Sequence, residues 1–143
     1  MHTHQLLRRT TILLVGFTAA LTGVAQGAVP PAPAVGKTYN VTVHTGNRSG
    51  AGTDSNVYLR LYGTHGVSPE VQLDNAVDNF ERNQLDEFQF RLTDLGTRTK
   101  ACVRFDRLGG DDAEWYADWV DVTGEFFQFY RWFGSDQIAC RNA

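Results

Sequence analysis

Apolar residues occupy every second position in several short stretches of this chain, and turn-forming residues separate the stretches. These stretches lie at residues 39–43, 57–61, 71–73, 88–92, 101–105, 115–122 and 126–133. A period of two is typical of a β-strand with one buried face, and no window carries a convincing helical stripe. Short strands with turn signals between them predict an all-β antiparallel sandwich or barrel.

The first residues follow a different pattern, that of a secretory signal. Two arginines precede an apolar run at 12–21, and Ala25 and Gly27 stand at the spacing that signal peptidase prefers. The run is far shorter than the roughly 20 apolar residues that a membrane-spanning helix needs, which argues against a membrane anchor. We therefore expect residues 1–27 to be cleaved and the protein to be secreted.

The remainder divides into a lead-in and one domain. Residues 28–36 hold three prolines among small residues and predict an extended linker, whereas residues 37–143 contain all of the strand patterns. The predicted signal contains two arginines and no acid, so its removal changes the net charge from −3 to −5. Because nucleic-acid binding relies on clustered lysines and arginines, we expect no nucleic-acid partner for this acidic domain.

The chain contains two cysteines, Cys102 and Cys140. An even number of cysteines in an exported chain indicates a disulfide, which here would attach the C-terminal tail to a strand. The alternative is two separate buried thiols. A zinc site built from cysteine pairs is excluded, since no second Cys or His pair accompanies them.

Two loops rich in oxygen-bearing side chains, residues 50–56 and 74–79, each adjoin a predicted strand. Calcium takes about six to eight oxygen ligands, and neighbouring loops can supply them together. The second loop is not an EF-hand, because Asn79 stands at the position of the required glycine and Leu85 at that of the required acid. A calcium site would therefore lie between the loops. The alternative is that these side chains only cap turns.

Several motifs follow one another in a recognisable order between residues 37 and 133. They are Tyr39-x-Val41-x-Val43-x-Thr45-Gly46, Gly50-Ala51-Gly52-Thr53-Asp54-x-Asn56-Val57-Tyr58-Leu59-x-Leu61-x-Gly63, Leu73-Asp74-Asn75, Asn79-Phe80-Glu81-Arg82 with Asp86-x-Phe88, Leu95-Gly96, Trp115-Tyr116-x-Asp118-x-Val120-x-Val122, and Phe127-x-Phe129-x-Arg131-Trp132-Phe133. This order resembles a PLAT domain, also called the lipoxygenase homology domain. The resemblance implies two four-stranded antiparallel sheets packed as a sandwich.

Calcium-binding members of this family hold an ion between the two loops, and the resemblance transfers its ligands to positions of this chain. The implied ligands are Thr53, Asp74, Asn75, the Val77 carbonyl and Asn79, with Gly52, Asp54, Asp78 and Asp112 as further candidates. Asn79 stands where some members have an acid, which leaves one negative charge fewer. A second ion in some members uses an acid where this chain has Gly50, so we expect one calcium ion.

The resemblance implies a secreted, non-catalytic binding module that acts with calcium on a lipid surface or a lipid-associated protein. Val67, Val77 and Trp115 are the candidates for membrane contact, with core packing as the alternative for Trp115. The alternative function is a protein–protein interaction module in which calcium only stabilises loops. We expect no enzyme, because Ser49 and Ser68 lack the Gly-x-Ser-x-Gly motif of a hydrolase. We also expect a monomer.

Overall fold

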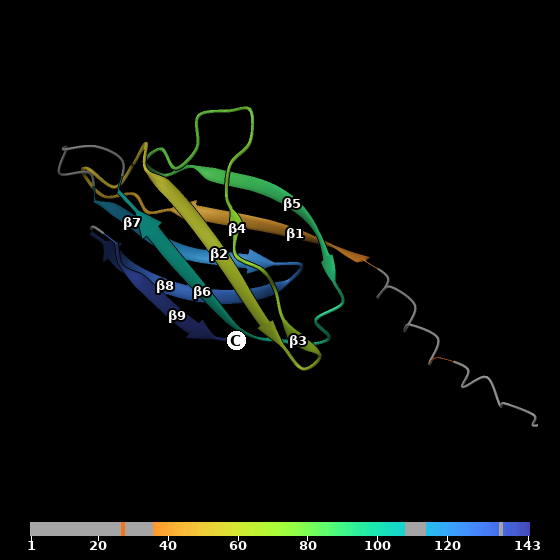
Figure 1. Cartoon of the computed structure of the whole chain (residues 1–143). Helices are drawn as coiled ribbons and strands as arrows, with labels where there is room; N and C mark the ends of the chain where they lie inside the picture. Colours follow the sequence, from red (N-terminus) through yellow and green to blue (C-terminus); the bar gives the residue numbers. More distant parts are fainter. Residues whose placement is uncertain (1–26, 28–35, 108–113, 135) are drawn as a thin grey trace, which may run out of the picture. The chain divides into compact units, whose positions relative to one another are not determined.

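The structure is a computed structural model that describes Gly27 and residues 36–107, 114–134 and 136–143 (Figure 1). Its strands are β1 (Gly36–Thr45), β2 (Asn56–Gly63), β3 (Gly66–Val67), β4 (Val71–Gln72), β5 (Leu85–Thr93), β6 (Arg98–Asp106), β7 (Trp115–Val122), β8 (Glu125–Phe133) and β9 (Ile138–Asn142). Within the described residues no helix is long and apolar enough to cross a membrane. The predicted signal except Gly27, and the lead-in except Gly36, lie outside the described residues.

The strands form two antiparallel sheets, which confirms the predicted all-β sandwich. One sheet has the order β5-β1-β7-β8, and the other has the order β3-β2-β6-β9 with β4 also paired to β2. We expected four strands in each sheet, whereas the second has five. The reason is that β3 pairs with the end of β2 at Tyr62, while β4 pairs with its middle at Tyr58. Two short strands thus share one edge of β2.

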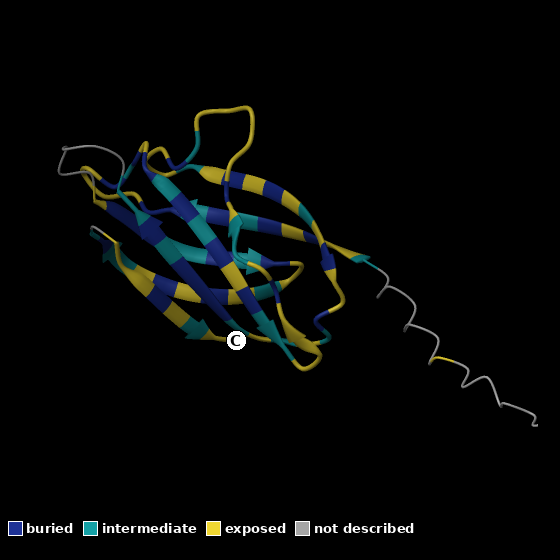
Figure 2. Ribbon diagram, in the orientation of Figure 1, coloured by how far each residue is buried: buried dark blue, intermediate teal, exposed yellow. Residues whose placement is uncertain are grey.

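The core lies between the sheets and is built from the inward side chains of the alternating strands. Figure 2 shows this alternation as bands of buried and exposed residues along each strand. The largest fully buried side chains include Tyr39, Leu59, Phe105, Phe127 and Phe133. The hydroxyl of Tyr39 accepts a hydrogen bond from the Leu95 backbone N–H at 2.8 Å, so its polar end is satisfied inside the core.

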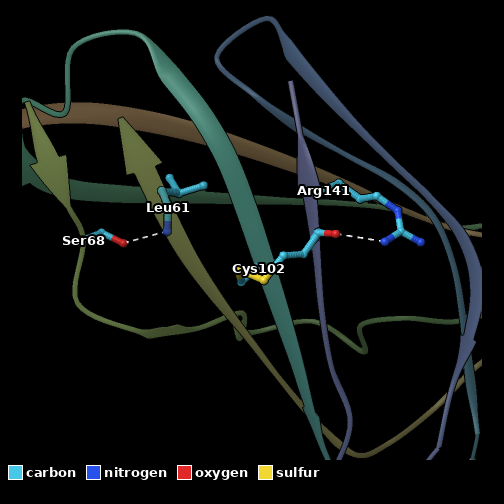
Figure 3. Close-up of a disulfide and its surroundings, with 5 residues drawn as sticks. Leu61, Ser68, Cys102 and Arg141 are labelled. Carbon is cyan, nitrogen blue, oxygen red and sulfur yellow. Dashed lines mark hydrogen bonds between the residues drawn. A yellow bond between two sulfur atoms is a disulfide. The ribbon is translucent and has the colours of Figure 1, made fainter. Parts of the chain in front are cut away.

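The predicted disulfide is present between Cys102 and Cys140. The two residues are direct register partners on β6 and β9 (Figure 3), and Cys102 is buried whereas Cys140 is exposed. The sequence pattern did not predict β9 as a strand, because β9 has only five residues and most of them are exposed. The disulfide attaches this C-terminal edge strand to the centre of its sheet.

Candidate metal site between two loops

Two loops meet at one end of the sandwich, where β1 ends, β2 begins and β5 begins. The first loop, residues 46–55, is bonded to the second, residues 73–84, by the Thr53 N–H, which donates to the Phe80 carbonyl at 3.1 Å. A Cβ added at Gly52 would lie only 3.1 Å from the same carbonyl oxygen. The close approach of the two backbones therefore favours glycine at this position.

A polar hollow of about 280 Å³ separates the side chains of the two loops. Most of the ligands implied by the resemblance line it. They are Thr53, Asp54, Asp74, Val77, Asp78 and Asn79. Residues far apart in the sequence thus supply hydroxyl, carboxylate, amide and carbonyl oxygens to one place, which is the donor set that a hard cation such as calcium takes.

Asn79 is the member of this set with an unsatisfied atom. Its Oδ1 is buried and has no hydrogen-bond partner among the described residues. Leaving such an acceptor unpaired costs about 1–3 kcal/mol. A cation in the hollow would offer Oδ1 the partner that the protein does not.

Two other predicted residues do not line the hollow, and a third falls outside the described residues. Asn75 does not line the hollow: its Oδ1 accepts from the Val77 N–H at 3.0 Å and its Nδ2 donates to the Glu87 carbonyl at 3.1 Å. It shapes the loop instead, as Asn does in turns. Gly52 lines a neighbouring hollow with Gly50 and Glu81. Asp112 lies outside the described residues.

The structure adds Glu81, which the sequence analysis did not consider as a ligand. Oxygen atoms of Asp54, Asp78 and Glu81 all lie within 4.8 Å of one another, and all three side chains are exposed. Glu81 is part of a motif that we used only to identify the family, and its proximity to Asp54 depends on how the loops meet. The three carboxylates gather negative charge at one point between the loops, with Arg82 beside them.

A buried carboxylate holds the second loop in shape. Asp86 is only 2% exposed, and it accepts hydrogen bonds from the Phe80 N–H and from Gln84 Nε2, both at 2.8 Å. The same Gln84 nitrogen also donates to the Asp78 carbonyl at 2.8 Å. Burial raises the pKa of the Asp86 carboxyl above its usual value, while the two hydrogen bonds oppose the rise. Asp86 and Gln84 thereby fix the backbone that carries Asp78 and Asn79.

The three predicted membrane-contact residues have different surroundings. Val77 is 62% exposed and borders the hollow. Val67 is 54% exposed, but it pairs with Tyr62 near the opposite end of β2 from the two loops (Figure 1). The prediction of Trp115 as a membrane contact is wrong, because its side chain is fully buried and its Nε1 donates to Thr45 Oγ1 at 3.0 Å. Its side chain faces inward at the start of β7 and fills the core.

Solved structures with the same fold include lipoxygenases and a toxin. The coral 8R-lipoxygenase superposes with a TM-score of 0.65 and 26% identity, covering 74% of this chain and 17% of that chain. The alpha toxin from Clostridium absonum superposes with a TM-score of 0.62 and 21% identity, covering 82% of this chain and 34% of that chain, and this likeness concerns the fold alone. In each case the match is to part of a larger protein.

Sequence comparison leads to the same family. A mouse relative, lipoxygenase homology domain-containing protein 1, is 40% identical over 96 residues, which are 64% of this chain and 5% of that protein. This chain therefore spans only a small part of that relative's length. The family model for the PLAT/LH2 domain matches residues 39–141, nearly all of the sandwich. The chain belongs to the PLAT/LH2 domain family.

Proposed function

We propose that this protein is a secreted, non-catalytic module that uses calcium to bind a lipid surface or a lipid-associated protein. The observation that carries the proposal is the hollow between the two loops, in which Asn79 has an unpaired buried oxygen beside Asp54, Asp74 and Asp78. The coral 8R-lipoxygenase that shares the fold is described as calcium-activated via a C2-like domain. This description supports the same role for the loops here.

Thr53, Asp74, the Val77 carbonyl and Asn79 would hold the ion, with Asp54 and Asp78 as neighbouring carboxylates. Bound calcium supplies positive charge at an end of the domain that is otherwise acidic. This matters at a membrane, because an anionic lipid surface repels uncompensated carboxylates and attracts a cation held near it. Val77, exposed beside the hollow, would then contact the lipid.

The side chains that resemble catalytic groups have structural partners instead. Ser68 is 5% exposed. Its Oγ accepts from the Leu61 N–H at 2.9 Å (Figure 3) and donates to the Pro69 carbonyl. His44 stacks on the indole ring of Trp119, and its Nδ1 lies 2.9 Å from Asp118 Oδ2. These contacts support a binding role rather than a hydrolytic one.

Calcium titration by calorimetry and by thermal unfolding tests the metal site. We expect a dissociation constant of about 0.1–1 mM, as in other extracellular modules. Asp74→Asn removes a carboxylate and should weaken binding by roughly tenfold, whereas Asn79→Asp restores a charge and should strengthen it. The control is Asp94→Asn, because Asp94 is exposed and pairs with Lys37 away from both loops. Absence of calcium heat and of any thermal shift at millimolar calcium would contradict the proposal.

Sedimentation with vesicles tests the lipid target. We expect the protein to pellet with phosphatidylserine-containing vesicles in calcium and to stay in solution with chelator. Val77→Ser should reduce pelleting several-fold by removing apolar contact, while Val67→Ser is the matched control because Val67 is almost as exposed but is remote from the loops. If calcium binds but no vesicle of any composition is pelleted, the alternative module with a protein partner and calcium-stiffened loops is favoured.

A further inference from the structure

The solvent side of the four-stranded sheet carries aromatic side chains where an exposed sheet face is normally polar. Phe126 and Tyr130 on β8 are 54% and 56% exposed. Trp132 on the same strand and Trp119 on β7 are half-buried. We call these four residues the aromatic face. Their inward neighbours Val120, Phe127 and Phe129 fill the core, so β8 is apolar on both sides.

Register places the aromatic face across the sheet rather than at a loop tip. Trp119 pairs with His44 of β1 on one side and with Gln128 of β8 on the other, and His44 in turn pairs with Leu85 of β5. Leu85 is 59% exposed, which extends the apolar surface to the far edge. The rings are in contact: the centroids of Trp119 and Phe126 are 4.9 Å apart.

The size and composition of this surface fit a protein interface. An aromatic side chain offers about 150–250 Å² of contact area, so the exposed parts of the aromatic face and Leu85 amount to roughly 400 Å². This is about half of the roughly 800 Å² that each partner contributes to a standard interface, with polar residues around it supplying the rest. Trp, Tyr and Phe are also the residues enriched in interfaces and in their energetically dominant contacts.

Ring orientation and charge argue against other occupants. The planes of Trp119 and Phe126 differ by 49°, and those of Tyr116 and Trp132 by 69°. The rings therefore do not lie in one plane, as stacking against a flat polymer surface would require. The exposed carboxylate of Glu87 on this side of the sheet disfavours an anionic membrane.

Exposed charges of opposite sign lie at the two ends of this side of the sheet, while Asp118 between them is paired with His44. At one end Arg48 lies over the Tyr116 ring, 4.3 Å from its centroid. At the other end the exposed side chain of Glu87 on β5 lies beside Thr42 of β1, its register partner. Trp119 lies between the two ends on β7. Half a turn about an axis through this centre brings the cationic end of one copy to the acidic end of another, as an isologous two-fold interface requires.

We propose that the aromatic face is a two-fold interface between two copies of this chain. The dimer goes beyond the calcium-dependent function. It does not depend on calcium, because none of the residues of the aromatic face lines the hollow between the loops. It also differs from the monomer expected from the sequence. Small interfaces are typical of weak, transient complexes, so we expect a dissociation constant on the order of micromolar to tens of micromolar.

Sedimentation velocity of the purified protein with chelator, from about 1 µM to about 1 mM, tests this proposal across that range. We expect the mass to rise from one copy to two. Phe126→Ser should raise the dissociation constant at least about tenfold, because it removes a central aromatic contact. Arg48→Glu should also weaken the dimer, because it places an acid opposite Glu87. Circular dichroism would verify that each variant is folded.

Ile138→Ser is the matched control, since Ile138 is 62% exposed on the other sheet and should leave the dissociation constant within about twofold. A single-copy mass at every concentration would overturn the proposal and leave a different protein as the occupant of the aromatic face. Equal weakening by Phe126→Ser and Ile138→Ser would also overturn it, because self-association would then be unspecific.

Discussion

Replacing Trp115 by alanine is expected to lower the free energy of unfolding by about 3–5 kcal/mol, measured by urea denaturation. The indole ring is fully buried, and it contacts the rings of Phe80 and Phe133 at centroid distances of 5.2 and 5.4 Å. The substitution would leave a cavity and remove the hydrogen bond to the Thr45 hydroxyl. Because Phe80 also borders the hollow between the loops, we expect calcium affinity to fall as well.

A second variant separates the core role of Trp115 from a membrane role. Trp115→Phe keeps most of the ring volume but leaves the buried Thr45 hydroxyl without its donor, so the expected loss is about 1–3 kcal/mol. Val77→Ser, at an exposed position, should change stability by less than about 0.5 kcal/mol. If Trp115→Phe reduced vesicle binding at full stability, the tryptophan would have to be accessible to lipid, contrary to the structure.

Removing the disulfide is the other change with a large expected effect. Cys102 and Cys140 are separated by 38 residues, and closing a loop of this length stabilises the folded state by about 4 kcal/mol in the chain-entropy model. We expect the double variant with both cysteines replaced by serine to lose about 2–4 kcal/mol of unfolding free energy, measured by urea denaturation under oxidising conditions. Reduction of the native protein should produce a similar loss.

Without the disulfide, unfolding should begin at β9, which is an edge strand of five residues. Its Arg141 donates to the carbonyls of Gln128 and Phe129 on β8, so β9 also joins the two sheets along one side. Hydrogen exchange should therefore show faster exchange at residues 138–142 in the double variant than in the native protein. If exchange there is unchanged while global stability falls, the disulfide acts mainly on the unfolded chain.

The two binding surfaces of this domain are built by different means. The site between the loops depends on backbone held by Asp86 and Gln84, whereas the aromatic face depends on the pairing of β7 with β8, including its register shift between Ala117 and Trp119. A change at Phe126 should therefore leave calcium binding intact, and a change at Asp74 should leave self-association intact. Separate surfaces would allow the domain to hold a second copy and a lipid surface at the same time.

The sequence by itself determined the strands and their inward residues. Alternation is a local property, and one buried face per strand is enough to predict that Val41, Leu59 and Phe127 lie in the core. The disulfide and the pair of oxygen-rich loops were also predictable, because residue type and motif order indicated them directly. The family resemblance carried by the motif order also named most of the residues that the structure places around one hollow.

Only the tertiary structure decided which neighbours each side chain has, because strand pairing joins residues far apart in the chain. Trp115 begins a strand, and the pairing of β7 with β8 directs it into the core rather than toward a loop tip. Glu81 reaches Asp54 because the Thr53 N–H bonds to the Phe80 carbonyl, a contact between two loops. The aromatic face has the same origin: Trp119 and Phe126 look unrelated in sequence, and sheet register places them together on one exposed surface.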